Sequence, residues 1–171
     1  MDTIVETSRL LLRYQCAADV PFLTDLWSDE AVTRYLGGPR ERDWLRMVFE
    51  ETAANPTAEK YDLWPLVEKS SGKLVGHCGL LEKEIEGESL VELNYMLHPS
   101  AWGEGYATEI GKALVQYAFE DCGLGNLVAL IHPENTPSEL TAQRIGMYFS
   151  GEVIRPGGAV RKLYRFDNLS E

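Results

Sequence analysis

A short glycine-containing loop, Trp102-Gly103-Glu104-Gly105-Tyr106-Ala107, has the composition of a binding site for an anion. Gly103, Gly105 and Ala107 carry little side-chain bulk, so several backbone N–H groups can turn toward one anion. A helical stripe of apolar residues begins just after the loop, and the positive end of a helix attracts phosphate. The loop therefore fits a phosphate cradle, while a tight strand-to-helix turn would use the same glycines.

The common nucleotide motifs do not fit this loop. A Walker A loop needs Gly-Lys-Ser or Gly-Lys-Thr, and the sequence contains neither. A dinucleotide fingerprint would place glycine at position 108, where Thr108 stands. The acids at the required distance, Glu120 and Asp121, would end a helix rather than a strand. Neither a nucleoside triphosphate nor a dinucleotide is the expected ligand.

The histidines and cysteines indicate no metal or nucleophile site. His98 and His132 each precede a proline at an expected strand end, where an imidazole could titrate near neutrality. No carboxylate stands at metal-ligand spacing, so structural roles are favoured and no metal is expected. The cysteines are odd in number and form no CxxC pair. Cys78 and Cys122 are expected to be packing residues.

A strand and a helix position the glycine loop. Residues 91–97 alternate between apolar and polar types, which predicts a strand, and Pro99 ends it. From Thr108 the apolar residues follow a helical stripe, and Gly123 marks its expected end. The loop is thus expected to connect the end of a strand to the start of a helix.

The remaining sequence predicts one continuous α+β domain over residues 1–171, without repeats or linkers. Further strands are expected at residues 7–14, 61–67, 73–81, 127–132, 152–154 and 160–166. Helices are expected after an Asp19 cap, over residues 41–54 with Trp44 and Phe49 buried, and after Pro137. Thr136 and Glu139 would form the capping box of the last helix, and Gly146 would end it.

Composition restricts the partners and the compartment. The net charge of −11 argues against nucleic acid, which is held by Lys and Arg fields, and favours a cationic partner. No apolar leader or membrane-length segment occurs, so a cytoplasmic protein without membrane contact is expected. A monomer or a homodimer is the expected assembly.

The loop resembles the acyl-CoA-binding motif of the GCN5-related N-acetyltransferases (GNAT), Gln/Arg-x-x-Gly-x-Gly/Ala after a central strand. Trp102 replaces the Gln or Arg, and this form, Trp-Gly-x-Gly-Tyr-Ala-Thr-Glu, is similar to the RimJ/RimL-like branch of ribosomal-protein N-terminal acetyltransferases. Asn135, Ser138 and the segment 143–147 match a second motif of that branch. The resemblance covers nearly the whole chain.

The resemblance implies the GNAT fold, a three-layer α/β/α arrangement whose mixed, mostly antiparallel sheet has splayed central strands. It also implies acetyl-CoA as co-substrate and no metal. The pantetheine arm would bond the main chain of Met96, Leu97 and His98, and Asn135 would hold the cofactor or the splayed strand end. The loop amides would hold the pyrophosphate. With Ser138, the cofactor-binding residues would then include Trp102, Gly103, Glu104, Gly105, Tyr106, Ala107 and Thr108.

Two residues are the catalytic candidates within that scheme. Glu92, a carboxylate on the central strand, would act as general base, although it could equally be a charged residue on a solvated sheet face. Many relatives use a helix tyrosine as acid, but Ala142 stands at that position. Ser138 is the expected substitute, as in the RimL-like branch, and its alternative role is helix capping.

The expected function is therefore transfer of acetyl from acetyl-CoA to a primary amine by direct attack. A protein N-terminal amine is one possible acceptor. Small cationic amines, such as polyamines or aminoglycosides, and amino acids are the alternatives. A module of another class, which binds acyl-CoA as a sensor without turnover, also stays open.

Overall fold

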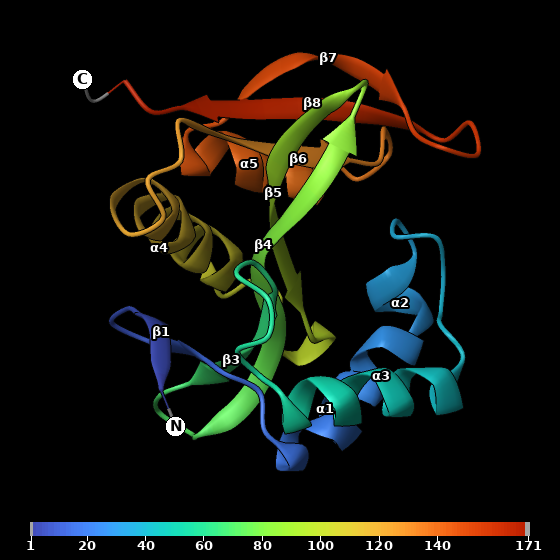
Figure 1. Cartoon of the computed structure of the whole chain (residues 1–171), viewed down its shortest axis with the longest axis vertical. Coiled ribbons are helices and arrows are strands. Elements are labelled where there is room, and N and C mark those ends of the chain that lie inside the picture. The colour runs from blue at the N-terminus through green and yellow to red at the C-terminus, as the bar shows by residue number, and fades with distance from the viewer. Residues whose placement is uncertain (1, 170–171) are drawn as a thin grey trace.

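The computed structural model describes residues 2–169, and its centre is an eight-stranded sheet in the order β1-β2-β3-β4-β5-β6-β8-β7 (Figure 1). The strands are β1 (Thr3–Glu6), β2 (Leu10–Arg13), β3 (Leu63–Glu68), β4 (Lys73–Ile85), β5 (Glu88–Leu97), β6 (Asn126–Ile131), β7 (Tyr148–Ile154) and β8 (Val160–Asp167). The helices are α1 (Val20–Ser28), α2 (Glu30–Thr33), α3 (Arg42–Ala54), α4 (Tyr106–Glu120) and α5 (Thr136–Ile145), with short 3-10 turns η1 (Ala17–Asp19) and η2 (Pro99–Ala101).

Neighbouring strands pair antiparallel except for β5 and β6, which are parallel. Their only register pair within residues 2–169 joins Glu92 to Val128. By contrast, β4 pairs with β5 without a break from Gly76–Leu97 to Ile85–Glu88. The two central strands therefore separate beyond Glu92, and the expected mixed sheet with splayed central strands is confirmed.

The β4–β5 hairpin extends through most of the molecule and connects the two halves of the sheet (Figure 1). Glu86 and Gly87 form its turn with φ angles of 50° and 85°. Positive φ at both central residues is what a two-residue hairpin turn with the right-handed strand twist requires. This tight turn holds the register that places Glu92 beside β6.

The helices cover the sheet from two sides (Figure 1). α4 packs Ile110, Leu114 and Ala118 into the main core, where each is fully buried. α1 and α3 form a separate small cluster that includes Leu23 and Leu45. Figure 1 shows α4 and α5 on one side of the central hairpin and α1, α2 and α3 on the other.

Some local details differ from the sequence predictions. The strand expected at residues 7–14 is shorter: β2 covers only residues 10–13, because residues 7–9 turn from β1, which was not predicted. α2 was not predicted, since four residues carry no helical period. Trp44 is 51% exposed rather than buried, because α3 packs through Leu45 and Phe49. No helix within residues 2–169 is both long and apolar enough to cross a bilayer.

Candidate active site

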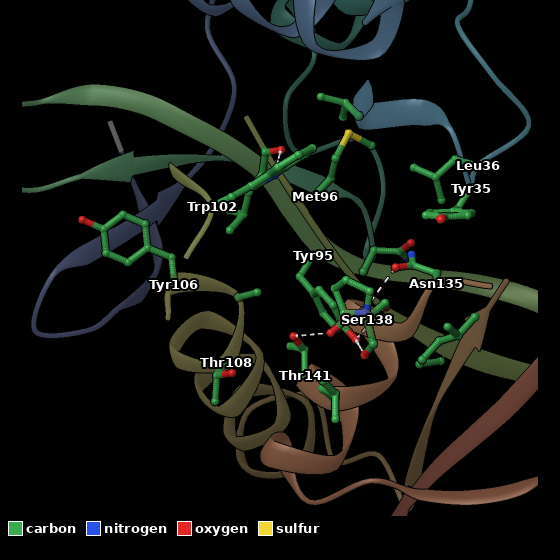
Figure 2. Close-up of a pocket in the computed structure, with 18 of the residues that line it drawn as sticks. Tyr35, Leu36, Tyr95, Met96, Trp102, Tyr106, Thr108, Asn135, Ser138 and Thr141 are labelled. Atoms are coloured by element: carbon green, nitrogen blue, oxygen red, sulfur yellow. Dashed lines mark hydrogen bonds between the residues drawn. The ribbon is translucent and has the colours of Figure 1, made fainter. Parts of the chain in front are cut away.

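The separation of β5 from β6 opens a pocket of about 980 Å³. It is lined mainly by residues 31–32, 34–36, 92–97, 101–103, 105–108, 129–132 and 135–138. Figure 2 shows two ends of the pocket: Tyr106 and Thr108 of α4 lie at one end, and Tyr35 and Leu36 lie at the other. The expected cofactor positions His98 and Glu104 are not among the lining residues.

The glycine loop forms the α4 end of the pocket. Gly103 and Gly105 have φ angles of 79° and 78°, a left-handed conformation that favours glycine, and Gly105 is the N-cap of α4. A Cβ at Gly103 would meet nothing within 4 Å. Within the described chain, no group accepts a hydrogen bond from the amides of residues 103–108. These free N–H groups at a helix N-terminus fit a pyrophosphate.

Arg9 connects the β1–β2 turn to this loop. Its Nε donates to Glu109 Oε2 at 2.7 Å, and one guanidinium nitrogen donates to the Glu104 carbonyl at 2.9 Å. The guanidinium carbon also lies 4.6 Å from the centre of the Tyr106 ring. Thr7 Oγ1 adds a 2.6 Å hydrogen bond to Glu109. The network holds the loop in the conformation that leaves its amides free.

Some main-chain groups at the end of β5 already form hydrogen bonds with nearby residues. The His98 amide donates to the Val75 carbonyl at 2.8 Å, and Trp102 Nε1 donates to the Leu97 carbonyl at 2.9 Å. His98 Nδ1 accepts from the Ser100 amide and so caps η2. The Trp102 ring is 51% exposed at the pocket (Figure 2). Trp102 thus fastens the loop to the strand end.

Glu92 lies at the point where the strands separate, and it lines the pocket while only 8% exposed. Burial raises the pKa of its carboxyl group above the ordinary value. Lys83 Nζ, 3.9 Å from Glu92 Oε2, opposes that rise. The alternative of a solvated sheet face is wrong for this residue, since the carboxylate is buried. Its elevated pKa is the property expected of a general base.

Ser138 faces Tyr95 across the pocket (Figure 2). The Tyr95 hydroxyl donates to the Ser138 carbonyl at 3.0 Å and lies 3.2 Å from Ser138 Oγ. Burial raises the pKa of Tyr95 to about 12, so the phenol keeps its proton at neutral pH. The Ser138 amide donates to Asn135 Oδ1 at 3.3 Å.

Asn135 is therefore the N-cap of α5, and the expected capping box of Thr136 and Glu139 was wrong. Glu139 instead accepts hydrogen bonds from Tyr164 at 2.7 Å and from Lys162 at 3.0 Å. Because the Asn135 side chain supplies the cap, the Ser138 hydroxyl is not needed for it. The capping alternative for that hydroxyl loses its support.

The opposite end of the pocket is built by the segment after α2. Tyr35 packs against His132, with ring centres 5.0 Å apart. The guanidinium carbon of Arg34 lies 5.3 Å from the centre of the Tyr35 ring. Ala31, Leu36 and these three side chains line the pocket. Figure 2 shows Tyr95 between this segment and the α4 end of the pocket.

A buried histidine attaches α1 to the sheet beside this end. Trp27 Nε1 donates to His77 Nδ1 at 3.0 Å, and His77 Nε2 lies 3.1 Å from the Leu63 carbonyl. An indole N–H can only donate, so Nδ1 accepts and Nε2 carries the proton. Burial lowers the pKa of His77 to about 4. His77 therefore holds α1 in place as a neutral imidazole.

The cysteines lie away from the pocket. Cys78 is fully buried, and burial raises the pKa of its thiol to about 12. Cys16, Cys78 and Cys122 are absent from the pocket lining within residues 2–169. The described residues also contain no cluster of three or more His, Cys, Asp or Glu side chains that could hold a metal ion.

Sequence reasoning identified the glycine loop, Glu92 and Ser138, and the structure places all three around one pocket. It missed Tyr95 as the partner of Ser138, and it missed the role of Arg9. Alternation along β5 could have indicated that the Tyr95 side chain points inward, because it lies on the same strand face as the buried Leu93. Nothing in the sequence near Arg9 indicates a contact with a loop so distant in the chain.

Comparison with known proteins agrees with this geometry. The family model described as "Acetyltransferase (GNAT) domain" matches residues 9–148. YkkB of Bacillus subtilis (strain 168) is 32% identical over 149 residues, covering 86% of this chain and 87% of its own. An N-acetyltransferase named p20 from Bacillus licheniformis is 30% identical, covering 99% and 97%. A solved GNAT acetyltransferase from Bacillus anthracis has a TM-score of 0.81 at 26% identity, covering 95% and 97%.

The splayed mixed sheet and the glycine loop before α4 match the fold of solved acetyltransferases. The chain belongs to the GNAT acetyltransferase family. It is therefore an acetyl-CoA-dependent acetyltransferase with the fold that the resemblance implied.

Proposed function

We propose that this enzyme transfers acetyl from acetyl-CoA to a primary amine, with Glu92 as general base and Ser138 as general acid. The observation that carries the proposal is one pocket with free loop amides at one end and a buried carboxylate where the central strands part. The amine would enter from the Tyr35 end, opposite the loop (Figure 2).

The loop residues supply the cofactor site. The unbonded amides of residues 103–108 would hold the pyrophosphate, and the Arg9 network would keep them aligned. The pantetheine arm would lie along β5, where Met96 and Leu97 line the pocket. In the antiparallel pairing the His98 amide points to β4, so alternation directs the main chain of Tyr95 and Leu97 toward the gap, rather than that of Met96 and His98 as expected. The Leu97 carbonyl already accepts from Trp102 Nε1, so the Leu97 amide and the Tyr95 main chain would bond the arm.

Glu92 would remove the proton that the attacking amine must lose. An ammonium ion has no free electron pair, so attack on the thioester carbonyl carbon requires deprotonation first. A carboxylate with a raised pKa holds the proton more readily than an exposed one. The nitrogen–carbon bond then forms, and the carbon–sulfur bond of the tetrahedral intermediate breaks.

Ser138 would return a proton to the departing thiolate. Its hydroxyl lies 3.2 Å from the Tyr95 hydroxyl, which would turn from the Ser138 carbonyl to donate to Ser138 Oγ as the proton leaves. Water would then return a proton to the pair, because the pKa of Tyr95 favours the protonated phenol. Direct attack of the amine on the thioester carbonyl carbon accounts for the transfer, with Ser138 as a proton donor rather than a nucleophile. No covalent enzyme intermediate is then needed.

The resemblance to the RimJ/RimL-like branch favours a protein N-terminal amine as acceptor. Polyamines, aminoglycosides and amino acids are the alternatives that the family suggests. All of these acceptors present a primary amine, so the chemistry of Glu92 and Ser138 is the same for each.

Calorimetry with three ligands tests the cofactor assignment. Acetyl-CoA should bind and raise the melting temperature, whereas NADH and ATP should not, because the loop matches neither of their motifs. NADH binding as tightly as acetyl-CoA would overturn the assignment of the loop.

A further inference from the structure

The charge of the pocket lining is opposite to that of the whole protein. The chain carries a net charge of −11. Yet Glu92 is the only carboxylate among the lining residues, all of which fall in the described chain, and two arginines, Arg34 and Arg144, accompany it. The acidic surplus of the protein therefore lies outside the pocket that receives the acceptor.

Arg34 provides the positive charge at the acceptor end of the pocket. It is exposed, it lies over the Tyr35 ring, and it forms no ion pair with any residue in the range 2–169. The Tyr35–His132 pair and the apolar side chains of Ala31 and Leu36 complete this end. A guanidinium with free N–H groups is suited to a carboxylate.

We propose that the acceptor carries one reacting primary amine and, at its other end, a carboxylate or similar anion that Arg34 binds. This inference rests on the proposed function and names its substrate class. Glu92 would meet the amine, the apolar and aromatic side chains would contact the body of the acceptor, and Arg34 would meet the anion. An amino-acid-like molecule and a peptide N-terminus next to an acidic residue share this chemistry.

The same charges disfavour polycations. Once Glu92 is used for the reacting amine, a second ammonium group would find no carboxylate in the lining and would approach Arg34 instead. Like charges at close range oppose binding, and desolvating an unpaired charge adds to the cost. Polyamines and aminoglycosides, which carry several ammonium groups, fit this pocket poorly.

A matched series of amines tests the inference. Hexylamine, hexamethylenediamine and ε-aminocaproate share one chain length and one reacting amine, and differ at the far end. The acetylation kcat/KM should be highest for ε-aminocaproate and lowest for hexamethylenediamine. We expect kcat/KM to differ about tenfold between successive amines of this series, which is the effect of gaining or losing one charge-assisted hydrogen bond. Two tripeptides that differ only in a Glu or a Lys at the second position distinguish a peptide source from a small molecule.

Charge reversal provides the control. Arg34→Glu should invert the order, so that hexamethylenediamine exceeds ε-aminocaproate, while the acetyl-CoA KM stays unchanged. Arg46→Glu makes the same charge change on α3, outside the pocket lining, and should leave the order as in the wild type.

Each outcome has one meaning. Wild-type preference for hexamethylenediamine, or an order that Arg34→Glu does not alter, would overturn this inference and leave amine acetylation standing. The absence of acetylation for every amine and peptide would instead overturn the proposed function, and the inference would fall with it.

Discussion

The Tyr95 hydroxyl lies 3.2 Å from Ser138 Oγ, and this contact joins β5 to the first turn of α5 across the active-site pocket. Burial raises the pKa of Tyr95 to about 12, so the pair holds two hydroxyl protons at neutral pH. Asn135 supplies the helix cap, which leaves the Ser138 hydroxyl available for proton transfer. In the proposed mechanism the pair would replace the helix tyrosine whose expected position is Ala142.

Ser138→Ala should lower kcat by about 10- to 1000-fold, near the usual range for general acid help, with little change in the acetyl-CoA KM. Tyr95→Phe should lower kcat less, and the double variant should be no slower than Ser138→Ala, because the two hydroxyls act in series. Steady-state kinetics on the four proteins measures this cycle. Thr52→Ala, which removes a helical hydroxyl from α3, is the control for stability. Wild-type turnover in Ser138→Ala would reassign the acid.

Glu92→Gln should make the enzyme slower and more stable at neutral pH. The raised pKa means that the folded state favours the protonated carboxyl, so stability is lost as pH rises through that pKa, and a neutral amide avoids the loss. The rate should fall most at lower pH, where the amine is fully protonated. Thermal unfolding and kcat against pH check both parts.

Glu139→Gln is the matched control for Glu92→Gln. Hydrogen bonds from Tyr164 and Lys162 hold the pKa of Glu139 below its ordinary value, so its ionised form is the stabilising one. The control substitution should destabilise the fold at neutral pH. A Glu92→Gln protein that is less stable than the wild type and equally active would contradict the base assignment.

Gly105→Ala should weaken acetyl-CoA binding by about tenfold, because a Cβ would intrude where the loop amides must approach phosphate. At a φ of 78° the alanine also costs stability, by roughly 1–2 kcal/mol. Gly123→Ala, with a φ of 69° and no atom within 4 Å of its Cβ, imposes the same backbone strain away from the pocket. Calorimetry should show lost affinity in the first variant alone. Equal affinity in both would mean that the glycines only form a turn.

Acid should destabilise the fold through His77. Burial lowers its pKa to about 4, while the unfolded chain takes up the proton near its ordinary value of 6.5. The unfolded state therefore binds more protons between these values. Stability is fully present above pH 6.5 and falls by about 1.4 kcal/mol per pH unit toward pH 4.

His77→Gln tests that loss, because glutamine can accept from Trp27 and donate to Leu63 without binding a proton. Urea unfolding measured between pH 6.5 and pH 5 gives the free energy of unfolding at each pH. That free energy should fall less steeply with decreasing pH in the variant than in the wild type. If the free energy of unfolding changed with pH equally in the two proteins, His77 would not be the cause of the loss of stability in acid.

The strand, the glycine loop and the start of α4 could be predicted because their signals are local. Period-two alternation ends at Pro99, glycine supplies the positive φ angles, and the helical stripe follows at once. The general architecture came from the resemblance to the GNAT family rather than from the residue pattern. Helix ends were less certain: Asn135, and not Thr136, caps α5.

The contacts that complete the site could not be predicted, because they join distant parts of the chain. Arg9 reaches Glu109 over a separation of 100 residues, and Tyr95 reaches Ser138 over 43. The burial of Glu92 likewise depends on where β5 and β6 separate, which is a property of the sheet and not of the strand. Periodicity left its two interpretations equal, and burial in the fold removes the solvated sheet face.

Amine-dependent release of free CoA thiol tests the central claim most directly. Wild-type protein incubated with acetyl-CoA should release thiol in proportion to added primary amine, and mass spectrometry should find one acetylated amine for each thiol. Glu92→Gln should reduce both products together. Thiol release that does not depend on the amine concentration would contradict direct transfer in this pocket. An acetyl group found on the protein instead of the amine would contradict it as well.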